Sequence, residues 1–238
     1  MRIIILTIGL LFLAGCASVP ANFGKPPANS NIGIVLLIDE NPTYMHVGTT
    51  IFNNESIDVA SNTEFKKLFG EQISGILKSG GHKTKLVEPS NKLVQERTSL
   101  FSYMSSNVNF KDEIKNELTL LAQEQGLDFI LLVYPNSGAA WPNSSAYLSG
   151  YGLYTRCFLG SCNAYALDYV GARIYDVNRN SSLKPMEFRF FQQEEMPSIL
   201  VPDNVNEISP EDIDKAAMVA KDNIIKLIEN MLITSEFI

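Results

Sequence analysis

Histidine and cysteine are scarce in this chain of 238 residues, which has two histidines, three cysteines and a single tryptophan. Neither His46 nor His82 lies in a metal-binding or nucleophile motif, so we interpret each as a solvated or hydrogen-bonded structural residue. The chain also lacks a Gly-x-Gly-x-x-Gly segment and a phosphate-binding loop. These absences predict no catalytic residues, no bound metal and no cofactor.

Positive charge is also in deficit. The chain has 19 lysines and arginines against 26 aspartates and glutamates, which gives a net charge of −7. An acidic surface repels nucleic acid and the head groups of anionic lipids. We therefore expect no nucleic-acid partner and no broad binding to anionic lipid.

Long hydrophobic runs are few, and the clearest is residues 3–13. This run is too short to cross a bilayer, which takes about 20 apolar residues. Arg2 before the run and small residues after it are typical of a secretory signal peptide. We therefore expect residues 1–16 to be an export signal.

The end of this segment, Leu13-Ala14-Gly15-Cys16, resembles the lipobox of bacterial lipoproteins. The resemblance implies that Cys16 receives diacylglycerol, becomes the first mature residue and anchors the protein to a membrane, since several acyl chains on one residue hold stably. An ordinary signal peptide that happens to contain a cysteine is the alternative. Ala17 stands where an aspartate would resemble an inner-membrane retention signal of enteric bacteria. This favours the outer membrane, with the protein facing the periplasm.

Two segments follow the predicted signal. Residues 17–31 are rich in Pro, Ala, Asn and Gly and have little that could form a core, so they predict a tether. Residues 32–238 contain no internal repeat and no second long linker. We predict that they form a single periplasmic α/β domain.

Cys157 and Cys162 are the cysteines that remain besides Cys16. An even pair in an oxidising compartment predicts a disulfide, which should contribute roughly 2 kcal/mol because the closed loop is small. A free redox pair and half of a metal site are the alternatives. The spacing is not Cys-x-x-Cys and no histidine lies nearby, so neither alternative has a supporting pattern.

Several segments predict β-strands in the first half of the chain. Apolar runs at residues 32–38 and 129–134 are typical of buried strands, and residues 83–87 form a shorter strand. Asn53-Asn54 lies between two β-branched stretches, which predicts a hairpin over residues 45–59.

Two helices are predicted between these strands. The first begins with a capping box, Ser61 and Glu64, carries apolar residues at helical spacing and ends at Gly80. The second spans residues 109–125 and ends at Gly126.

The second half of the chain predicts a long strand, its return and a last helix. Turn residues separate a strand at residues 163–177 from a returning strand at residues 186–193. Ser209 and Pro210 then stand in the favoured first positions of a helix, with the acids Glu211 and Asp212 behind them. In the long strand, period two places Ala164, Ala166, Val170, Ala172 and Ile174 on one face and Tyr165, Leu167, Tyr169, Arg173 and Tyr175 on the other.

Two short motifs carry a family resemblance. A helix runs through Gly126-Leu127-Asp128 into an apolar strand, and a later strand ends in Arg173-Ile174-Tyr175-Asp176-Val177. This order resembles a group of small envelope lipoproteins that includes the curli-secretion lipoprotein and the outer-membrane activators of penicillin-binding proteins, whose domains are similar to the amino-terminal domain of the TolB protein. The resemblance implies layers like those of that domain over residues 32–232, and a role as an assembly part or partner activator. Residues 137–162 depart from the pattern by adding an extended hairpin or loop.

Element order and resemblance together predict the fold class. We expect an α/β (α+β) fold with a mixed sheet of about five or more strands and three main helices, layered as in the TolB amino-terminal domain.

The added segment is the most informative for function. Residues 135–162 are rich in Gly, Ser, Asn and Tyr and hold the only tryptophan, a mixture typical of adaptable binding loops. The alternative is a decorated hairpin whose aromatic residues pack on the sheet. The candidate partner-binding residues are Trp141, Tyr147, Tyr151, Tyr154, Tyr165 and Tyr169.

Three hypotheses on function follow. The first is a non-enzymatic cell-envelope lipoprotein that binds a protein partner or itself. The second is a binding module for a small glycan or peptide, which needs a concave pocket lined by these aromatic residues. The third is an enzyme acting on cell-wall material, which needs the acids Asp39-Glu40 or Glu194-Glu195 at catalytic separation in a cleft.

Overall fold

The computed structural model describes residues 25–50, 53–104, 107–142, 144–183, 193–202 and 204–238. Cys16 and the predicted signal peptide therefore lie outside the described residues, as does most of the predicted returning strand at residues 186–193. Within the described part of the chain, no helix is long and apolar enough to span a bilayer.

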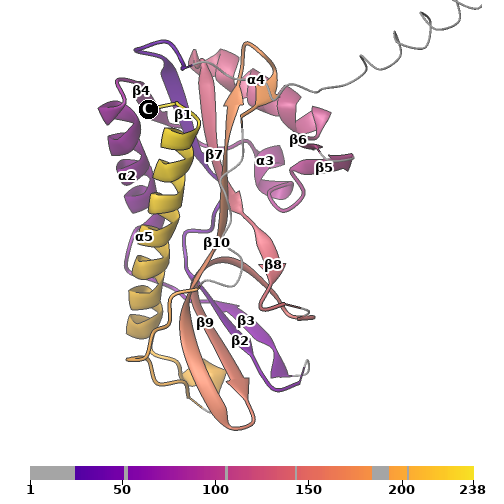
Figure 1. Ribbon diagram of the computed structural model, residues 1–238, viewed down its shortest axis with the longest axis vertical. Coiled ribbons are helices and arrows are strands. Elements are labelled where there is room, and N and C mark those ends of the chain that lie inside the picture. The colour runs from indigo at the N-terminus through magenta and orange to yellow at the C-terminus, as the bar shows by residue number, and fades with distance from the viewer. Residues whose placement is uncertain (1–24, 51–52, 105–106, 143, 184–192, 203) are drawn as a thin grey trace, which may run out of the picture.

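A mixed sheet of nine strands forms the centre of the molecule (Figure 1). Its main path runs β3-β2-β9-β10-β7-β1-β4, with β8 added to β9 and β11 added to β10. β1 is parallel to its neighbours β4 and β7. β10 is antiparallel to β7 and β9. The strands are β1 (Asn31–Leu36), β2 (Thr43–Val47), β3 (Glu55–Asp58), β4 (Lys83–Leu86), β7 (Phe129–Pro135), β8 (Ser137–Ala139), β9 (Tyr147–Phe158), β10 (Ser161–Asp176) and β11 (Ser181–Ser182).

Helices cover the sheet unequally. On one face, α2 (Phe65–Ser79) and α5 (Pro210–Thr234) bury the largest apolar cluster against β1, β7 and β10. On the other face, α3 (Asn91–Gln95) and α4 (Asp112–Gln125) bury a second cluster against β1 and β7. A short hairpin, β5 (Phe101–Met104) and β6 (Asn107–Phe110), joins these two helices, and a 3-10 turn, η2 (Val205–Glu207), precedes α5. The predicted α/β class with three main helices is confirmed.

β10 divides the sheet into two halves. Residues 170–176 pair with β7, whereas residues 161–169 pair with β9. We call β4, β1, β7 and residues 170–176 the upper half, and β3, β2, β9 and residues 161–169 the lower half. The free side of the lower part of β10 is covered by a short return, where the N–H groups of Ala166 and Met196 each donate a backbone hydrogen bond of 2.8 Å.

Most of the predicted strands and helix ends are confirmed. The hairpin of β2 and β3 forms, Gly80 and Gly126 end α2 and α4, and Gly126 has a φ of 64°. The period-two pattern of β10 is also confirmed, since Ala166, Val170, Ala172 and Ile174 pack under α2 and α5.

Two predicted helix starts are wrong. The capping box at Ser61 does not form, because the Ser61 hydroxyl accepts from the Thr63 N–H instead, and α2 begins only at Phe65. α4 begins at Asp112 because residues 107–110 are the strand β6, paired with β5. A tertiary pairing thus replaces the local helical signal at this point.

Of the two forms predicted for the segment at residues 135–162, an extended hairpin or a loop, the structure shows the hairpin. Residues 147–158 form one long strand, and only the stretch between β8 and β9 remains a connection. Residues 147–158 are extended because their backbone pairs with β10. A segment rich in Gly and Ser does not by itself predict a strand.

Candidate functional site

Three of the six predicted contact residues are buried. Tyr151 and Tyr154 are 2% exposed and Tyr169 is fully buried, so in this fold a partner cannot reach their side chains. Tyr151 packs against the rings of Phe65 and Phe69, with 5.5 Å between ring centroids in both pairs. The prediction that these three tyrosines belong to a contact surface is therefore corrected: they are core residues.

The hydroxyls of the buried tyrosines are largely tied to the backbone. Tyr151 donates to the carbonyl of Glu40 at 2.8 Å, and Tyr169 donates to the carbonyl of Ala139 at 3.0 Å. Burial raises the pKa of Tyr151 and of Tyr154 above the usual tyrosine value. Through their hydrogen bonds, Tyr151 and Tyr169 hold segments together rather than offering a polar tip to a ligand.

The other three candidates reach the surface. Trp141 and Tyr165 are partly buried, and Tyr147 is 66% exposed. The guanidinium of Arg156 lies 4.0 Å from the centre of the Trp141 ring, and Tyr165 stacks on Tyr154 with 5.5 Å between centroids. Tyr147 points away from Trp141 and Tyr165. The next residue of the strand, Leu148, packs in the same cluster as these two residues, and successive side chains of a strand point to opposite faces.

Trp141 and Tyr165 belong to a sheet face that no described helix covers. Each of the other apolar clusters includes helical residues, whereas this one draws only on strands and the connection between β8 and β9. We call this surface the lower face. Its buried members are Val47, Ala140, Ala146, Leu148, Tyr154, Leu167 and Tyr169, and its partly exposed members are Met45, Trp141 and Tyr165.

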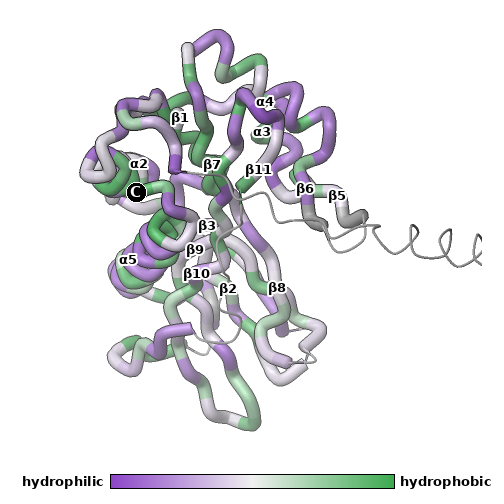
Figure 2. Tube along the Cα trace, turned by 45° about the horizontal axis from the view of Figure 1, so that its top comes forward, coloured by the Kyte–Doolittle hydropathy of each residue, from purple (hydrophilic) through white to green (hydrophobic). Residues whose placement is uncertain are grey.

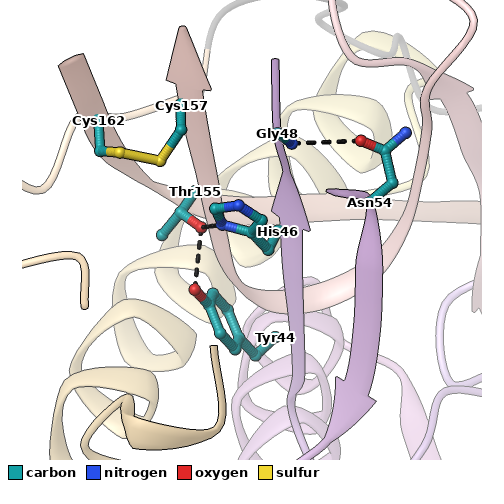
Figure 3. The surroundings of a disulfide bond; sticks show 7 residues. All are labelled: Tyr44, His46, Gly48, Asn54, Thr155, Cys157 and Cys162. Carbon is teal, nitrogen blue, oxygen red and sulfur yellow. Dashed lines mark hydrogen bonds between the residues drawn. A yellow bond between two sulfur atoms is a disulfide. The ribbon is translucent and has the colours of Figure 1, made fainter. Parts of the chain in front are cut away.

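The lower half ends in the hairpin that joins β9 to β10. Cys157 and Cys162 face each other across this hairpin and form the predicted disulfide (Figure 3). Beyond them, Phe158 is 57% and Leu159 is 79% exposed. Figure 2 shows the hydrophobic stretch at this end of the hairpin. Leu159 was not among the predicted contact residues, although a Phe-Leu pair enclosed by two cysteines was a signal for it in the sequence.

Beside the disulfide, three side chains share a hydrogen-bond network (Figure 3). The hydroxyl of Thr155 lies 3.0 Å from the Tyr44 hydroxyl and 2.9 Å from Nδ1 of His46. Burial lowers the pKa of His46, against a smaller opposite effect of Glu55. Thr155 is fully buried, so a substrate cannot approach its hydroxyl in this fold, and the network joins β2 to β9.

A cavity of about 480 Å³ lies at the opposite end of the molecule, in the upper half. Lys25, Asp128, Asp176, Arg179 and Phe237 are among its lining residues. None of the six predicted aromatic residues lines it. This cavity is therefore not the aromatic-lined pocket that the small-ligand hypothesis requires.

The predicted carboxylate pairs have structural partners. Asp39 accepts a hydrogen bond of 2.6 Å from Arg97, and Glu194 accepts one of 3.3 Å from Asn223. Among the described residues, no three His, Cys, Asp or Glu side chains come close enough to hold a metal ion. A carboxyl that the sequence did not single out, Asp168, has its pKa raised to about 6, mainly by burial and further by the charge of Glu194.

Neither a scan of the chain against protein-family models nor a search of curated proteins found a match.

Proposed function

We propose that this protein is a cell-envelope lipoprotein, anchored through Cys16, that binds a protein partner through the lower face. The observation that carries the proposal is that no described helix covers the lower face, where the partly exposed Trp141 and Tyr165 pack on one apolar cluster and Arg156 lies over the Trp141 ring. The other sheet faces are closed by helices.

The chemistry of the lower face suits a protein contact. Tryptophan, tyrosine and arginine are the residue types that most often dominate binding energy at protein interfaces. Here the guanidinium of Arg156 lies over the Trp141 ring, so both side chains lose little further freedom on binding. Tyr165 is held in the same way by Tyr154 beneath it.

The layout of the domain supports an anchor at one end and a contact at the other. Lys25, where the described chain begins, lines the upper cavity together with Asp176, the last residue of β10. The lower face lies along the first half of β10. A chain tethered through Cys16 would thus present the lower face away from its point of attachment.

The anchor is tested by labelling cells with an alkyne analogue of palmitate. We expect the wild-type protein to be labelled and to fractionate with the outer membrane, and Cys16→Ser to lose the label. An unlabelled wild-type protein would overturn the lipid anchor.

The contact is tested by photo-crosslinking in cells with a photoreactive amino acid at position 141 or 165, and at position 120 as control. Leu120 is 55% exposed on α4, far from the lower face. We expect a discrete protein adduct from positions 141 and 165 and none from position 120. An adduct with twice the mass of the chain identifies self-association. No adduct from a labelled, folded protein would count against the proposal.

A further inference from the structure

The turn between β9 and β10 is built against the usual preference. Phe158 pairs with Ser161, so Leu159 and Gly160 alone form the turn, with φ values of 49° and 84°. Turns with positive φ at both residues favour Asn-Gly or Gly-Gly, because a larger side chain crowds the backbone in this conformation. Leucine is thus poorly suited to this position. Burial in the core does not compensate for the unfavourable φ, because Leu159 is 79% exposed.

The same turn is also stiffened and left free of acidic charge. The disulfide between Cys157 and Cys162 closes the hairpin directly behind the exposed pair of Phe158 and Leu159. Residues 155–163 contain Arg156 and no acidic residue, in a chain with 26 of them. A local rule broken at an exposed apolar position, in a braced hairpin, is typical of a functional contact.

From these observations we infer that Phe158 and Leu159 form a docking plug, which enters an apolar socket with a neutral or acidic rim on a partner protein. The inference rests on the proposed function and deepens it, since Arg156, which lies over Trp141 of the lower face, is two residues before Phe158 on the same strand. The socket recognises the two exposed apolar side chains at the tip of the β9–β10 hairpin.

The position of the plug argues for a protein and against the anchoring membrane. β10 has 16 residues and runs from the plug to the upper cavity, a span of roughly 50 Å at the usual rise per residue. The nine residues from Cys16 to Lys25 reach about 30 Å at most. This stretch is shorter than the domain, so the plug reaches the membrane that holds Cys16 only when the domain lies nearly flat along it, and in every more upright orientation the plug points away from that membrane.

The test uses the full lipidated chain in cells, with a photoreactive residue in place of Phe158. We expect one discrete protein adduct, which Leu159→Asn abolishes and Leu120→Gln leaves intact. With the partner then identified and purified, Leu159→Asn should weaken the affinity at least about ten-fold. Because asparagine suits a positive φ, the same variant should melt at the wild-type temperature or higher.

The outcomes separate the possible occupants and roles. An adduct with lipid, with a second copy of the chain, or none at all would overturn the plug. Loss of the adduct together with a clear fall in melting temperature, in both Leu159→Asn and Leu159→Gly, would assign Leu159 a structural role and also overturn it. An adduct from position 141 but none from position 158 leaves the proposed function standing, whereas a missing lipid label defeats the anchor alone.

Discussion

At the scale of single residues, Gly152 is the position where the backbone leaves no room for a side chain. It has a φ of 140° and lies against β2, where an added Cβ would stand 2.2 Å from the carbonyl oxygen of Thr43. We expect Gly152→Ala to lower the free energy of unfolding by about 2–4 kcal/mol, because both the clash and the dihedral angle oppose it. Urea denaturation measures the change.

Gly75 is the matched control for this substitution. It lies in α2, and an added Cβ would have no heavy atom within 4 Å beyond its chain neighbours and the backbone of its own helix. Gly75→Ala should therefore raise the stability by about 0.5–1 kcal/mol, through helix propensity alone. Equal urea midpoints for the two variants would contradict the close approach of β2 and β9.

Asp168 makes stability depend on pH. Burial raises its pKa to about 6, so the folded state binds a proton that the unfolded state has already released above pH 4. The sign follows from linkage: stability is lost as the pH rises from about 4 to 6, and the full penalty is present at pH 7.5. We expect Asp168→Asn to stabilise the protein on the order of 2 kcal/mol at pH 7.5 and little at pH 4.

Thermal melts of both proteins across this pH range test the prediction. A melting-temperature difference that stays constant from pH 4 to pH 7.5 would mean that the Asp168 carboxyl is not the titrating group. Glu194→Gln serves as the comparison, because it removes only the smaller, coulombic cause of the shift.

At the scale of elements, the β9–β10 hairpin should survive without its disulfide. The bridge closes a small loop at the tip, whereas the ladder of the two strands continues from Phe158 and Ser161 down to Gly150 and Tyr169. The double variant Cys157→Ser, Cys162→Ser should lose at most about 2 kcal/mol of stability. Guanidinium denaturation measures this loss, and wild type under reducing conditions should match the variant. A globally unfolded variant would show that the hairpin depends on the bridge.

Helix termini show where local patterns mislead. Ser209 and Pro210 mark the start of α5 as predicted; the Ser209 side chain makes no cap hydrogen bond, and the fixed φ of Pro210 suits the first helical position. The same type of signal at Ser61 does not start α2, and the helical spacing from Asn109 yields to the pairing of Asn109 with Ser102 in another strand. Propensity is a weak preference that tertiary pairing overrides.

At the scale of the whole molecule, α5 joins the two halves of the sheet. Ile213, near its start, packs in the cluster with Tyr44 and Leu153 of the lower half, and Ile228, nearer its end, packs in the large cluster of the upper half. Figure 1 shows the helix running along the length of the sheet. We therefore expect the domain to unfold in one cooperative step.

Two variants test this cooperativity. Ile213→Ala and Ile228→Ala each remove a fully buried side chain and should cost about 2–4 kcal/mol. Each variant should show a single calorimetric transition at a lower melting temperature, whichever half of the sheet its side chain contacts. A separate early melt of the lower half in Ile213→Ala would show that the halves are independent.

The candidate site was predictable only in part, and two tyrosines of one strand show why. Tyr165 and Tyr169 lie on the same face of β10, yet Tyr165 is partly exposed and Tyr169 is fully buried. The difference comes from the Ala139 carbonyl, which accepts from the Tyr169 hydroxyl, and from Gln193, which donates to it. Both partners lie more than 20 residues away along the chain, so periodicity in the strand cannot distinguish the two tyrosines.

The sequence by itself determined the α/β class, the main strands, the alternate faces of β10, the start of α5 and the pairing of Cys157 with Cys162. Each of these depends on spacing between residues that are close along the chain. Only the tertiary structure decided that β10 is shared between β9 and β7, that Tyr151 and Tyr169 are core, and that Phe158 and Leu159 stand exposed. Those outcomes depend on which distant segments cover a face, and burial is a property of such long-range contacts.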